Sequence, residues 1–406
     1  MGDEERERRQ AWIVSTPHRV APGDAEPTVW SLTVEERLQR GLVRAGITRI
    51  GRIEPHEPAP AATGPCIVVR DDVFYDERVL EGLLGAQDVV LHHALSPSGP
   101  EPVAAACRPE LLPEAVATVR SGDARAQAGL QPASVLDLAS AYDRSLRKQH
   151  LPWVYAARGQ SMDFVEVENE LFAASYKGIT DLVTKWVFPR PARATVRVLA
   201  RWGVRPNTVT SCSYLLAAAV TWLFAEGWLA TGLVFAWLMT FLDTVDGKLA
   251  RCTLTSSRFG NVFDHALDLV HPPIWWAAWA VALPGGIAGH ELSVWVVIGG
   301  YLLGRVLEGT FSWAFGIQMF VWRPFDAFFR TIISRRNPNL LLLTGSLCIG
   351  APVLGFQAVA AWTAACIVIA FERNVRAHVE ARRGVEIHAW LDDPHPGQEG
   401  ENTTSH

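Results

Sequence analysis

The chain has 406 residues, a formal net charge of −5 and 19% charged side chains. This length suggests two or three domains, and the weakly acidic balance lacks the basic surface that binds nucleic acid. The six cysteines form no CxxC pair and no framework spacing, so we expect neither disulfides nor a zinc site.

Residues 1–130 have the pattern of a soluble α/β domain. Short β-like runs alternate with helical patterns, which predicts a mostly parallel sheet. The successive segments are 11–15, 33–45, 48–53, 66–70, 76–84, 88–92, 103–107 and 111–119. The charged start of the chain leads into no long apolar core, so we expect no signal peptide and a cytoplasmic location for this domain.

The order of these segments resembles the sugar-nucleotidyltransferase fold: a strand, a helix ending at Ala45-Gly46-Ile47, a second strand, and then Val68 to Asp72. Such enzymes carry a glycine-rich phosphate loop after their first strand, where this chain has Ser15 to Arg19. Without free backbone amides to hold a triphosphate, a degenerate nucleotidyltransferase-like domain is expected. Asp71 and Asp72 either bind a metal or cap the start of a surface helix.

Three further segments surround the membrane region. Residues 131–182 are predicted to be a helical linker, because leucines recur there among charged residues. Between 183 and 202, apolar residues alternate with arginines, which predicts an amphipathic helix on the membrane surface with a break near Pro189. Residues 385–406 are expected to be a disordered tail.

Residues 183–384 are predicted to form an all-α membrane domain with six transmembrane helices. The apolar runs are 208–225, 228–250, 259–283, 292–320, 339–354 and 356–372. Arginines and lysines gather before the first run, between the second and third, between the fourth and fifth, and after the sixth, whereas the opposite loops have none. The positive-inside rule predicts a multi-pass protein of the cytoplasmic membrane with both termini in the cytoplasm.

Four carboxylates, Asp243, Asp246, Asp264 and Asp268, lie between two strongly apolar stretches, roughly 229–242 and 274–283. An ionisable group at membrane depth costs at least ~2.5 kcal/mol, so a functional site is the default interpretation. The spacings of three and four put each pair on one face of a helix, and two facing helices would bring all four together. Such an all-oxygen cluster suits magnesium, manganese or calcium, and the charge pattern places it on the cytoplasmic side.

Two neighbours of the carboxylates indicate phosphate chemistry. Gly247 lets a ligand approach the backbone, and Arg251 offers a planar fork for phosphate. Phosphoryl transfer fits this combination, because paired metals can bridge phosphate oxygens while one carboxylate takes a proton from the attacking hydroxyl.

This string resembles the signature of the CDP-alcohol phosphotransferase family, an eight-residue pattern that the chain satisfies without a departure. The matching residues are Asp243, Asp246, Gly247, Ala250, Arg251, Gly260, Asp264 and Asp268. The resemblance implies transfer of a phosphoalcohol from a CDP-alcohol donor to an acceptor hydroxyl, with release of CMP. It also implies that the four aspartates hold two Mg²⁺ or Mn²⁺ ions, that Asp268 is the general base, and that the glycines, Ala250 and Arg251 receive the CDP moiety.

The family has a Pro-Asn-x-x-Thr element before its first span, which matches Pro206, Asn207 and Thr210. Asn207 or Thr210 either touches the nucleotide or caps the first span. A homodimer is a further expectation from the resemblance.

Three arginines outside the signature are candidates for contacts with the acceptor or its phosphate. Arg305 lies three residues before Glu308 in the fourth span, so it either pairs with that carboxylate or binds an anionic substrate. Arg330 and Arg335 belong to a basic connection that either faces anionic lipid or forms a wall of the acceptor pocket.

The preferred interpretation is a membrane transferase of phospholipid or polyol-phosphate biosynthesis, working on a CDP-alcohol and an alcohol acceptor within membrane lipid. A bifunctional protein whose soluble half makes the CDP-alcohol is the rival enzymatic hypothesis. A divalent-cation carrier is the non-enzymatic one, although a carrier has no use for a phosphate-binding arginine. The acceptor stays open among inositol or its phosphate, glycerol phosphate, another polyol phosphate and a lipid alcohol.

Overall fold

The structure is a computed structural model that describes residues 9–16, 28–93, 99–123, 129–156, 164–256 and 258–393, without the side chains of 258, 259, 261–265 and 267. The chain divides into two compact units. The first comprises Met1–Asp143, Gln149–Ala174 and Cys252–Leu254, and the second comprises Arg144–Lys148, Ser175–Arg251 and Thr255–His406.

A mixed sheet of six strands forms the centre of the first unit. Its strands are β1 (Gln10–Val14), β2 (Arg49–Ile53), β3 (Cys66–Arg70), β5 (Val89–His93), β6 (Glu101–Cys107) and β7 (Gln131–Ala133). Their order is β2-β1-β3-β6-β5-β7, and β6 runs antiparallel to both neighbours while the other pairs are parallel. The prediction of an α/β unit is confirmed, with a sheet that is mixed.

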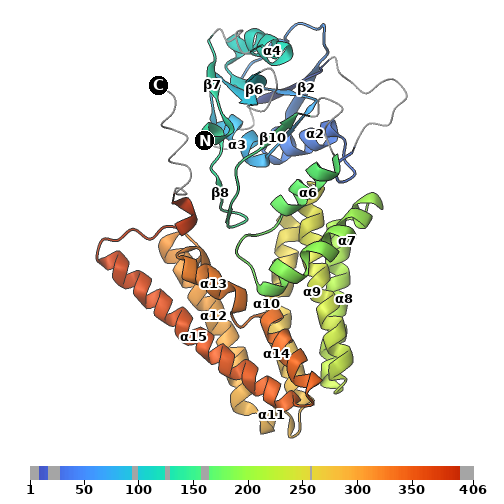
Figure 1. Ribbon diagram of the computed structural model, residues 1–406, viewed down its shortest axis with the longest axis vertical. Coiled ribbons are helices and arrows are strands. Elements are labelled where there is room, and N and C mark those ends of the chain that lie inside the picture. The colour runs from blue at the N-terminus through green and yellow to red at the C-terminus, as the bar shows by residue number, and fades with distance from the viewer. Residues whose placement is uncertain are drawn as a thin grey trace. The chain divides into compact units, whose positions relative to one another are not determined.

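Helices cover both faces of this sheet because side chains alternate along each strand. Ile67 and Val69 pack with α2 (Val34–Arg44) and α3 (Glu77–Gly85), whereas Val68 packs with α4 (Leu112–Ser121) on the opposite face (Figure 1). Thr33 and Glu36 form a capping box at the start of α2. The smaller strand β4 (Val73–Tyr75) pairs with β10 (Val154–Ala156).

The predicted helical linker is wrong for its first part. Residues 131–156 contribute β7, the four-residue α5 (Val135–Leu138), the paired β8 (Tyr142–Asp143) and β9 (Lys148–Gln149), and β10. The leucine pattern reflects α5 packing on α3, where a Cβ added to Gly82 would lie 2.1 Å from the Leu138 carbonyl oxygen. The second part of the predicted linker does contain a helix, α6 (Phe164–Ala174).

The second unit is helical. A π-helical turn, η2 (Val183–Val187), precedes α7 (Pro189–Arg201), so the helix begins at Pro189, where a break was predicted. The remaining elements are α8 (Pro206–Ala225), α9 (Leu229–Cys252), α10 (Arg258–Val281), α11 (Gly286–Gly289), α12 (Glu291–Phe315), η3 (Met319–Val321), α13 (Pro324–Ile332), α14 (Arg336–Cys348), α15 (Pro352–Arg382) and η4 (Trp390–Asp392).

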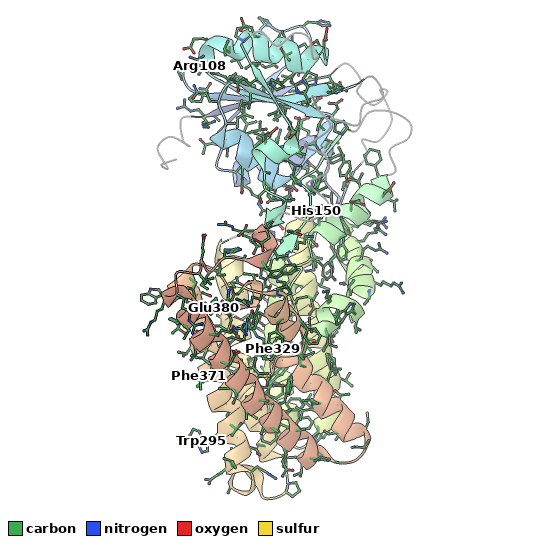
Figure 2. The ribbon with its side chains drawn as sticks, turned by 60° about the vertical axis from the view of Figure 1, so that its left-hand side comes forward. Arg108, His150, Trp295, Phe329, Phe371 and Glu380 are labelled. Atoms are coloured by element: carbon green, nitrogen blue, oxygen red, sulfur yellow. The ribbon has the colours of Figure 1, made fainter. Side chains whose placement is uncertain are left out.

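Four of these helices, α8, α9, α12 and α15, are long and apolar enough to cross a membrane, among the residues that the structure describes. Of the two other predicted spans, α10 has 24 residues but includes undescribed side chains, and α14 has only 13. Trp295 on α12 and Phe371 on α15 point outward and are 71% and 59% exposed (Figure 2). Exposed aromatic residues on such helices are expected where the neighbour is lipid, so the second unit is an integral membrane domain.

Two features hold the membrane helices together. Three tryptophans of α10, Trp275, Trp276 and Trp279, are at most 1% exposed. Trp275 and Trp279 make edge-to-face contacts with Phe224, and Trp276 makes one with Trp275. Helices α12 and α15 approach closely at Gly300, where an added Cβ would lie 2.5 Å from Thr363 Cγ2. Small residues allow such contacts between membrane helices.

The end of the chain is more ordered than predicted. The turn η4 lies inside the expected disordered tail, yet Leu391 within it is only 6% exposed. Burial of this apolar side chain stabilises the segment. Residues 394–406 lie outside the described residues.

Candidate functional site

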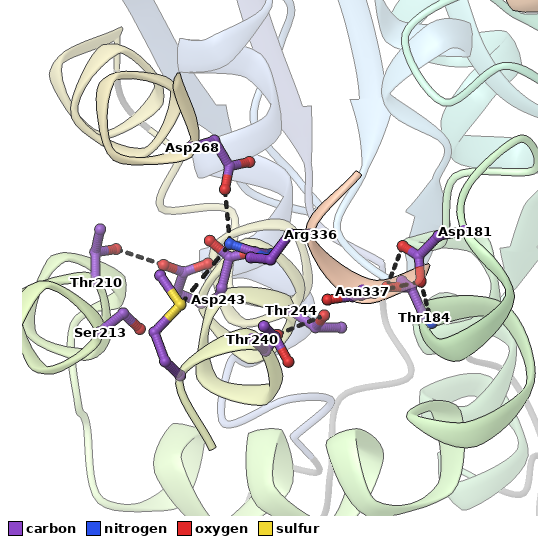
Figure 3. Close-up of polar contacts among 12 residues, drawn as sticks. Asp181, Thr184, Thr210, Ser213, Thr240, Asp243, Thr244, Asp268, Arg336 and Asn337 are labelled. Atoms are coloured by element: carbon purple, nitrogen blue, oxygen red, sulfur yellow. Dashed lines mark hydrogen bonds and ion pairs between the residues drawn. The ribbon is translucent and has the colours of Figure 1, made fainter. Parts of the chain in front are cut away.

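The carboxylates of α9 occupy one face of the helix where its apolar part ends. Asp243 and Asp246 are three residues apart, and Asp246 is 4% exposed. The Thr210 hydroxyl on α8 lies 2.6 Å from Asp246 Oδ2 and donates a hydrogen bond to it (Figure 3). A buried carboxylate needs such a donor or a cation, so Thr210 orients a member of the cluster. No side chain caps α8, and Asn207 is exposed.

Arg336 joins the helices that carry the aspartates. Its guanidinium Nη2 lies 2.5 Å from Asp243 Oδ2, and its Nη1 lies 2.8 Å from Asp268 Oδ1 (Figure 3). Helix α14 begins at Arg336, so α9, α10 and α14 converge on this one side chain. The structure thus brings Asp243 and Asp268 together as predicted. The sequence interpretation missed Arg336, whose only signal was its place in the basic connection.

Asp268 lies in α10 about one turn before two prolines that the helix contains. Pro272 and Pro273 have no N–H to donate to the carbonyls of Asp268 and Leu269 four residues earlier. The Tyr301 hydroxyl on α12 approaches these two oxygens at 3.0 and 3.2 Å and can donate to either. Tyr301 therefore fixes the backbone of Asp268, whose side chain is 50% exposed.

The glycine and the arginine of the signature are in contact. A Cβ added to Gly247 would lie 3.1 Å from Arg251 Nη2, so glycine gives this guanidinium its room. Arg251 Nε donates to the Ser175 carbonyl at 2.9 Å, and Lys248 Nζ lies 3.8 Å from the ring centre of Tyr176. The segment before α7 therefore holds the basic end of α9.

The remaining signature positions are less informative. The Ala250 carbonyl accepts a hydrogen bond from the backbone of Thr255 at 2.9 Å, and Gly260 is half-buried in α10. The side chain of Asp264 lies outside the described residues.

The donor set of the cluster fits a hard divalent cation. Asp243, Asp246 and Asp268 offer only carboxylate oxygens, which suit Mg²⁺ or Mn²⁺. Within the described part of the chain, no three His, Cys, Asp or Glu side chains lie close enough to form a metal site by themselves. The fourth predicted ligand, Asp264, is among the undescribed side chains.

A cavity of about 590 Å³ lies beside Asp268 in the membrane unit. Arg305, Arg330 and Arg335, the three candidates for acceptor contacts, all line it. Glu308 accepts from Arg305 at 2.8 Å and from Arg335 at 2.5 Å, so one carboxylate is shared by two arginines. The expected pair of Arg305 and Glu308 is present, and it leaves the cavity with excess positive charge.

Arg330 contributes the least compensated charge to this cavity. Its Nε and Nη1 are buried and have no hydrogen-bond partner among the described residues. Burial, together with the nearby positive charges of Arg335 and Arg147, lowers the pKa of Arg330 below its ordinary value. A buried guanidinium with such donors has the chemistry to bind an anion.

Asp181 and Asn337 also line the cavity, and the sequence interpretation missed both. Asp181 accepts from the backbone N–H groups of Val183 and Thr184, and Asn337 Nδ2 donates to it at 2.9 Å (Figure 3). Burial alone would raise the pKa of Asp181, but these hydrogen bonds hold it below its ordinary value. Asp181 and Asn337 are distant from each other in the sequence, so no local motif could have predicted their contact.

The carboxylates of the first unit are held by arginines. Asp71 accepts from the backbone N–H of Thr16 at 3.0 Å and pairs with Arg52 at 3.3 Å. Asp72 accepts two hydrogen bonds from the fully buried Arg70, at 2.8 and 2.7 Å. Neither aspartate caps a helix, because both lie in the turn between β3 and β4 and the cap of α3 is Asp76.

Comparison with known proteins matches residues 203–331 to the family described as CDP-alcohol phosphatidyltransferase. An archaetidylinositol phosphate synthase of Pyrococcus horikoshii is 28% identical over 134 residues, which are 32% of this chain and 69% of that protein. A phosphatidylinositol phosphate synthase of Mycobacteroides abscessus is 32% identical over 108 residues, which are 25% of this chain and 49% of that protein. The chain therefore spans about half the length of the mycobacterial relative.

Two crystal structures of Mycobacterium tuberculosis phosphatidylinositol phosphate synthase are similar to the chain. The one with CDP-DAG bound has 20% identity and a TM-score of 0.37, and covers 46% of this chain and 94% of that chain. The one in complex with manganese and citrate has 19% identity and a TM-score of 0.36, over 45% and 87% of the two chains. The segment 203–331, which carries the aspartates of α9 and α10, belongs to the CDP-alcohol phosphatidyltransferase family.

Proposed function

We propose that the chain moves a phosphoalcohol group from a CDP-alcohol to the hydroxyl of a phosphorylated polyol and releases CMP. The observation that carries this proposal is that Asp268 belongs both to the aspartate cluster and to the wall of the basic cavity. A carboxylate cluster suits a cation-bound diphosphate donor, whereas an arginine-rich cavity suits an acceptor with its own phosphate. The relatives named above are synthases of inositol phosphate lipids, which agrees with this acceptor class.

The four aspartates Asp243, Asp246, Asp264 and Asp268 are the residues that would hold two Mg²⁺ or Mn²⁺ ions. Such ions, when bound, neutralise phosphate charge and stabilise the leaving group. Arg336 supports the assignment, because an acidic cluster with one shared arginine retains negative charge that a cation can balance.

Asp268 is the proposed general base. It faces the cavity, and Tyr301 and Arg336 fix its backbone and its carboxylate. As the acceptor hydroxyl forms a bond to the phosphorus distal to cytidine, Asp268 takes the hydroxyl proton and the bond to CMP breaks. The departing phosphate charge lies near Arg251, whose guanidinium is held beside Gly247.

The CDP moiety is assigned to the signature framework. Gly247, Ala250, Arg251 and Gly260 are proposed to receive it, as the family resemblance implies. Asn207 and Thr210 are proposed at the same edge, and the hydrogen bond of Thr210 to Asp246 supports a site that joins the two helices.

The membrane arrangement completes the proposal. Helices α8, α9, α10, α12, α14 and α15 are the six proposed spans of a domain from residue 183 to 384. The positive-inside pattern supports an active site and both termini on the cytoplasmic side of the cytoplasmic membrane. A homodimer is proposed from the family resemblance.

We further propose that the first unit, residues 1–130, is a nucleotidyltransferase-like domain without activity of its own. The mixed sheet supports the likeness in fold, and the lack of activity is supported by the sequence from Ser15 to Arg19, which contains no glycine-rich phosphate loop after β1.

The test of the proposed function is CMP release by the purified full-length protein in lipid or detergent. CDP-diacylglycerol is incubated with a panel of alcohols, namely inositol, inositol phosphate, glycerol phosphate and a lipid alcohol, with Mg²⁺, with Mn²⁺ or with EDTA. CMP release that requires a phosphorylated polyol and a divalent cation is the expected result. Cation uptake into vesicles without CMP release would support a carrier instead.

A further inference from the structure

A short hairpin upstream of the family segment forms part of the cavity wall. Its tip, Arg144–Lys148, precedes residues 203–331, yet it belongs to the same compact unit as the membrane helices. Ser145 and Arg147 from this tip line the cavity that contains Asp268. The wall of the proposed acceptor site therefore includes residues that the family segment does not supply.

The tip is held tightly in the membrane unit. The backbone N–H of Gly178 donates to the Leu146 carbonyl at 2.8 Å. A Cβ added to Gly178 would lie 2.6 Å from the Arg147 carbonyl oxygen and 2.5 Å from Lys148 Cβ, so only glycine allows this approach. Arg147 itself has a φ of 51°, a conformation that costs a residue other than glycine ~1–3 kcal/mol. The contacts of the tip offset this cost and fix the direction of the Arg147 side chain.

The guanidinium of Arg147 is oriented by a side-chain amide. Its Nη1 donates to Gln318 Oε1 at 2.9 Å, and Gln318, which lies between α12 and η3, also lines the cavity. An amide oxygen is neutral, so this hydrogen bond positions the guanidinium without adding a negative charge to the cavity wall.

The charge of the cavity identifies the ligand class. Its lining contains six cationic side chains and three carboxylates. The cations are Arg147, Lys177, Arg305, Arg330, Arg335 and Arg336, and the carboxylates are Asp181, Asp268 and Glu308. Like charges at this density destabilise one another unless an anion joins them. A phosphate monoester carries about −1.5 to −2 charges at neutral pH and three acceptor oxygens, which matches this excess.

We propose that Arg147 binds the phosphate of the acceptor together with Arg330, so that the upstream hairpin contributes to the choice of acceptor. This inference rests on the proposed function and assigns to it a residue outside the family segment. Both arginines line the cavity. Arg330 provides its Nε and Nη1 groups, which have no hydrogen-bond partner among the described residues, and Arg147 provides a second guanidinium from the hairpin.

The decisive test compares two arginines of the same tip. Arg147→Gln removes the cavity-lining guanidinium, and Arg144→Gln is the matched control, because the Arg144 side chain is 81% exposed and does not line the cavity. A lost charge-assisted contact corresponds to roughly a tenfold change. We expect Arg147→Gln to raise the KM for glycerol phosphate or inositol phosphate about tenfold, with the KM for CDP-diacylglycerol and kcat within twofold of wild type. Arg144→Gln should match wild type in all three.

Inorganic phosphate gives a second readout that does not require turnover of the variant. We expect phosphate to raise the melting temperature of the wild type and of Arg144→Gln, and to do so only at about tenfold higher concentration for Arg147→Gln. Arg147→Lys keeps the charge and should lie between them. Equal phosphate dependence and equal acceptor KM in the two glutamine variants would overturn the inference. Absence of CMP release by the wild type with every phosphorylated acceptor would overturn the proposed function itself.

Discussion

Both units of the molecule contain closely spaced aspartates, and the two sets have different surroundings. In the first unit, Asp71 pairs with Arg52 and Asp72 pairs with Arg70, and each of these arginines also pairs with at least one glutamate. In the membrane unit, Asp243 and Asp268 share Arg336, while Asp246 has the hydroxyl of Thr210. Carboxylates in ion-pair networks can serve structure alone, whereas an acidic cluster beside a cavity can hold a cation and act on a substrate.

The largest effect is expected from an aspartate-to-alanine substitution in the membrane unit, with the same substitution in the first unit as its control. Asp246→Ala removes a buried carboxylate of the cluster, so cation-dependent CMP release should fall by more than ~10²-fold. Asp71→Ala removes a carboxylate from the first unit and should leave kcat within twofold of wild type. Both proteins are assayed at saturating CDP-alcohol and Mn²⁺ after membrane insertion has been verified. A near-normal rate for Asp246→Ala would refute the metal assignment.

Binding and proton transfer can be separated at Asp268. Asp268→Asn cannot accept the hydroxyl proton, so kcat should fall by ~10²-fold. The asparagine keeps an oxygen for Arg336, and binding of the CDP-alcohol, measured by calorimetry, should stay within about threefold of wild type. Loss of donor binding would make Asp268 chiefly a metal ligand.

A smaller effect is expected where a hydroxyl supports the site from a distance. Tyr301→Phe leaves the carbonyls of Asp268 and Leu269 without their donor, and a lost hydrogen bond of ~1 kcal/mol predicts a roughly fivefold lower kcat. Tyr155→Phe in the first unit removes a hydroxyl that donates to Glu170 at 3.5 Å, and kcat should not change. Equal kcat in both variants would show that Tyr301 does not position the base.

The last prediction is that the first unit has no nucleotidyltransferase activity. Because the first unit has no glycine-rich phosphate loop after β1, the full-length protein should release no pyrophosphate from CTP with inositol phosphate or glycerol phosphate. Release is measured with a coupled pyrophosphate assay and Mg²⁺, with a cytidylyltransferase as positive control. Robust CTP turnover would establish the bifunctional hypothesis and place Asp71 and Asp72 among catalytic groups.

Elements formed by short stretches of the chain are predictable from sequence, whereas contacts between distant stretches are not. Strands β1, β2, β3, β5 and β6, helices α2, α3 and α4, and the signature aspartates follow from periodicity and spacing within short windows. Arg336, Asp181 and Asn337 become neighbours only when α14 packs against α9 and the segment before η2. The helical linker was mispredicted because its leucines serve a four-residue turn on α3, a tertiary contact that overrides the local pattern.

The close approach of α12 and α15 at Gly300 has a consequence for substrate range. Tyr301 and Arg305 follow this glycine on α12 and line the cavity, so the spacing of the two helices sets how far the cavity wall stands from Asp268. That spacing depends on a hydrogen atom facing Thr363, in the apolar interior of the domain. Substitution of small residues where α12 meets α15 can therefore widen or narrow the acceptor site during evolution. The charged residues of the reaction need not change.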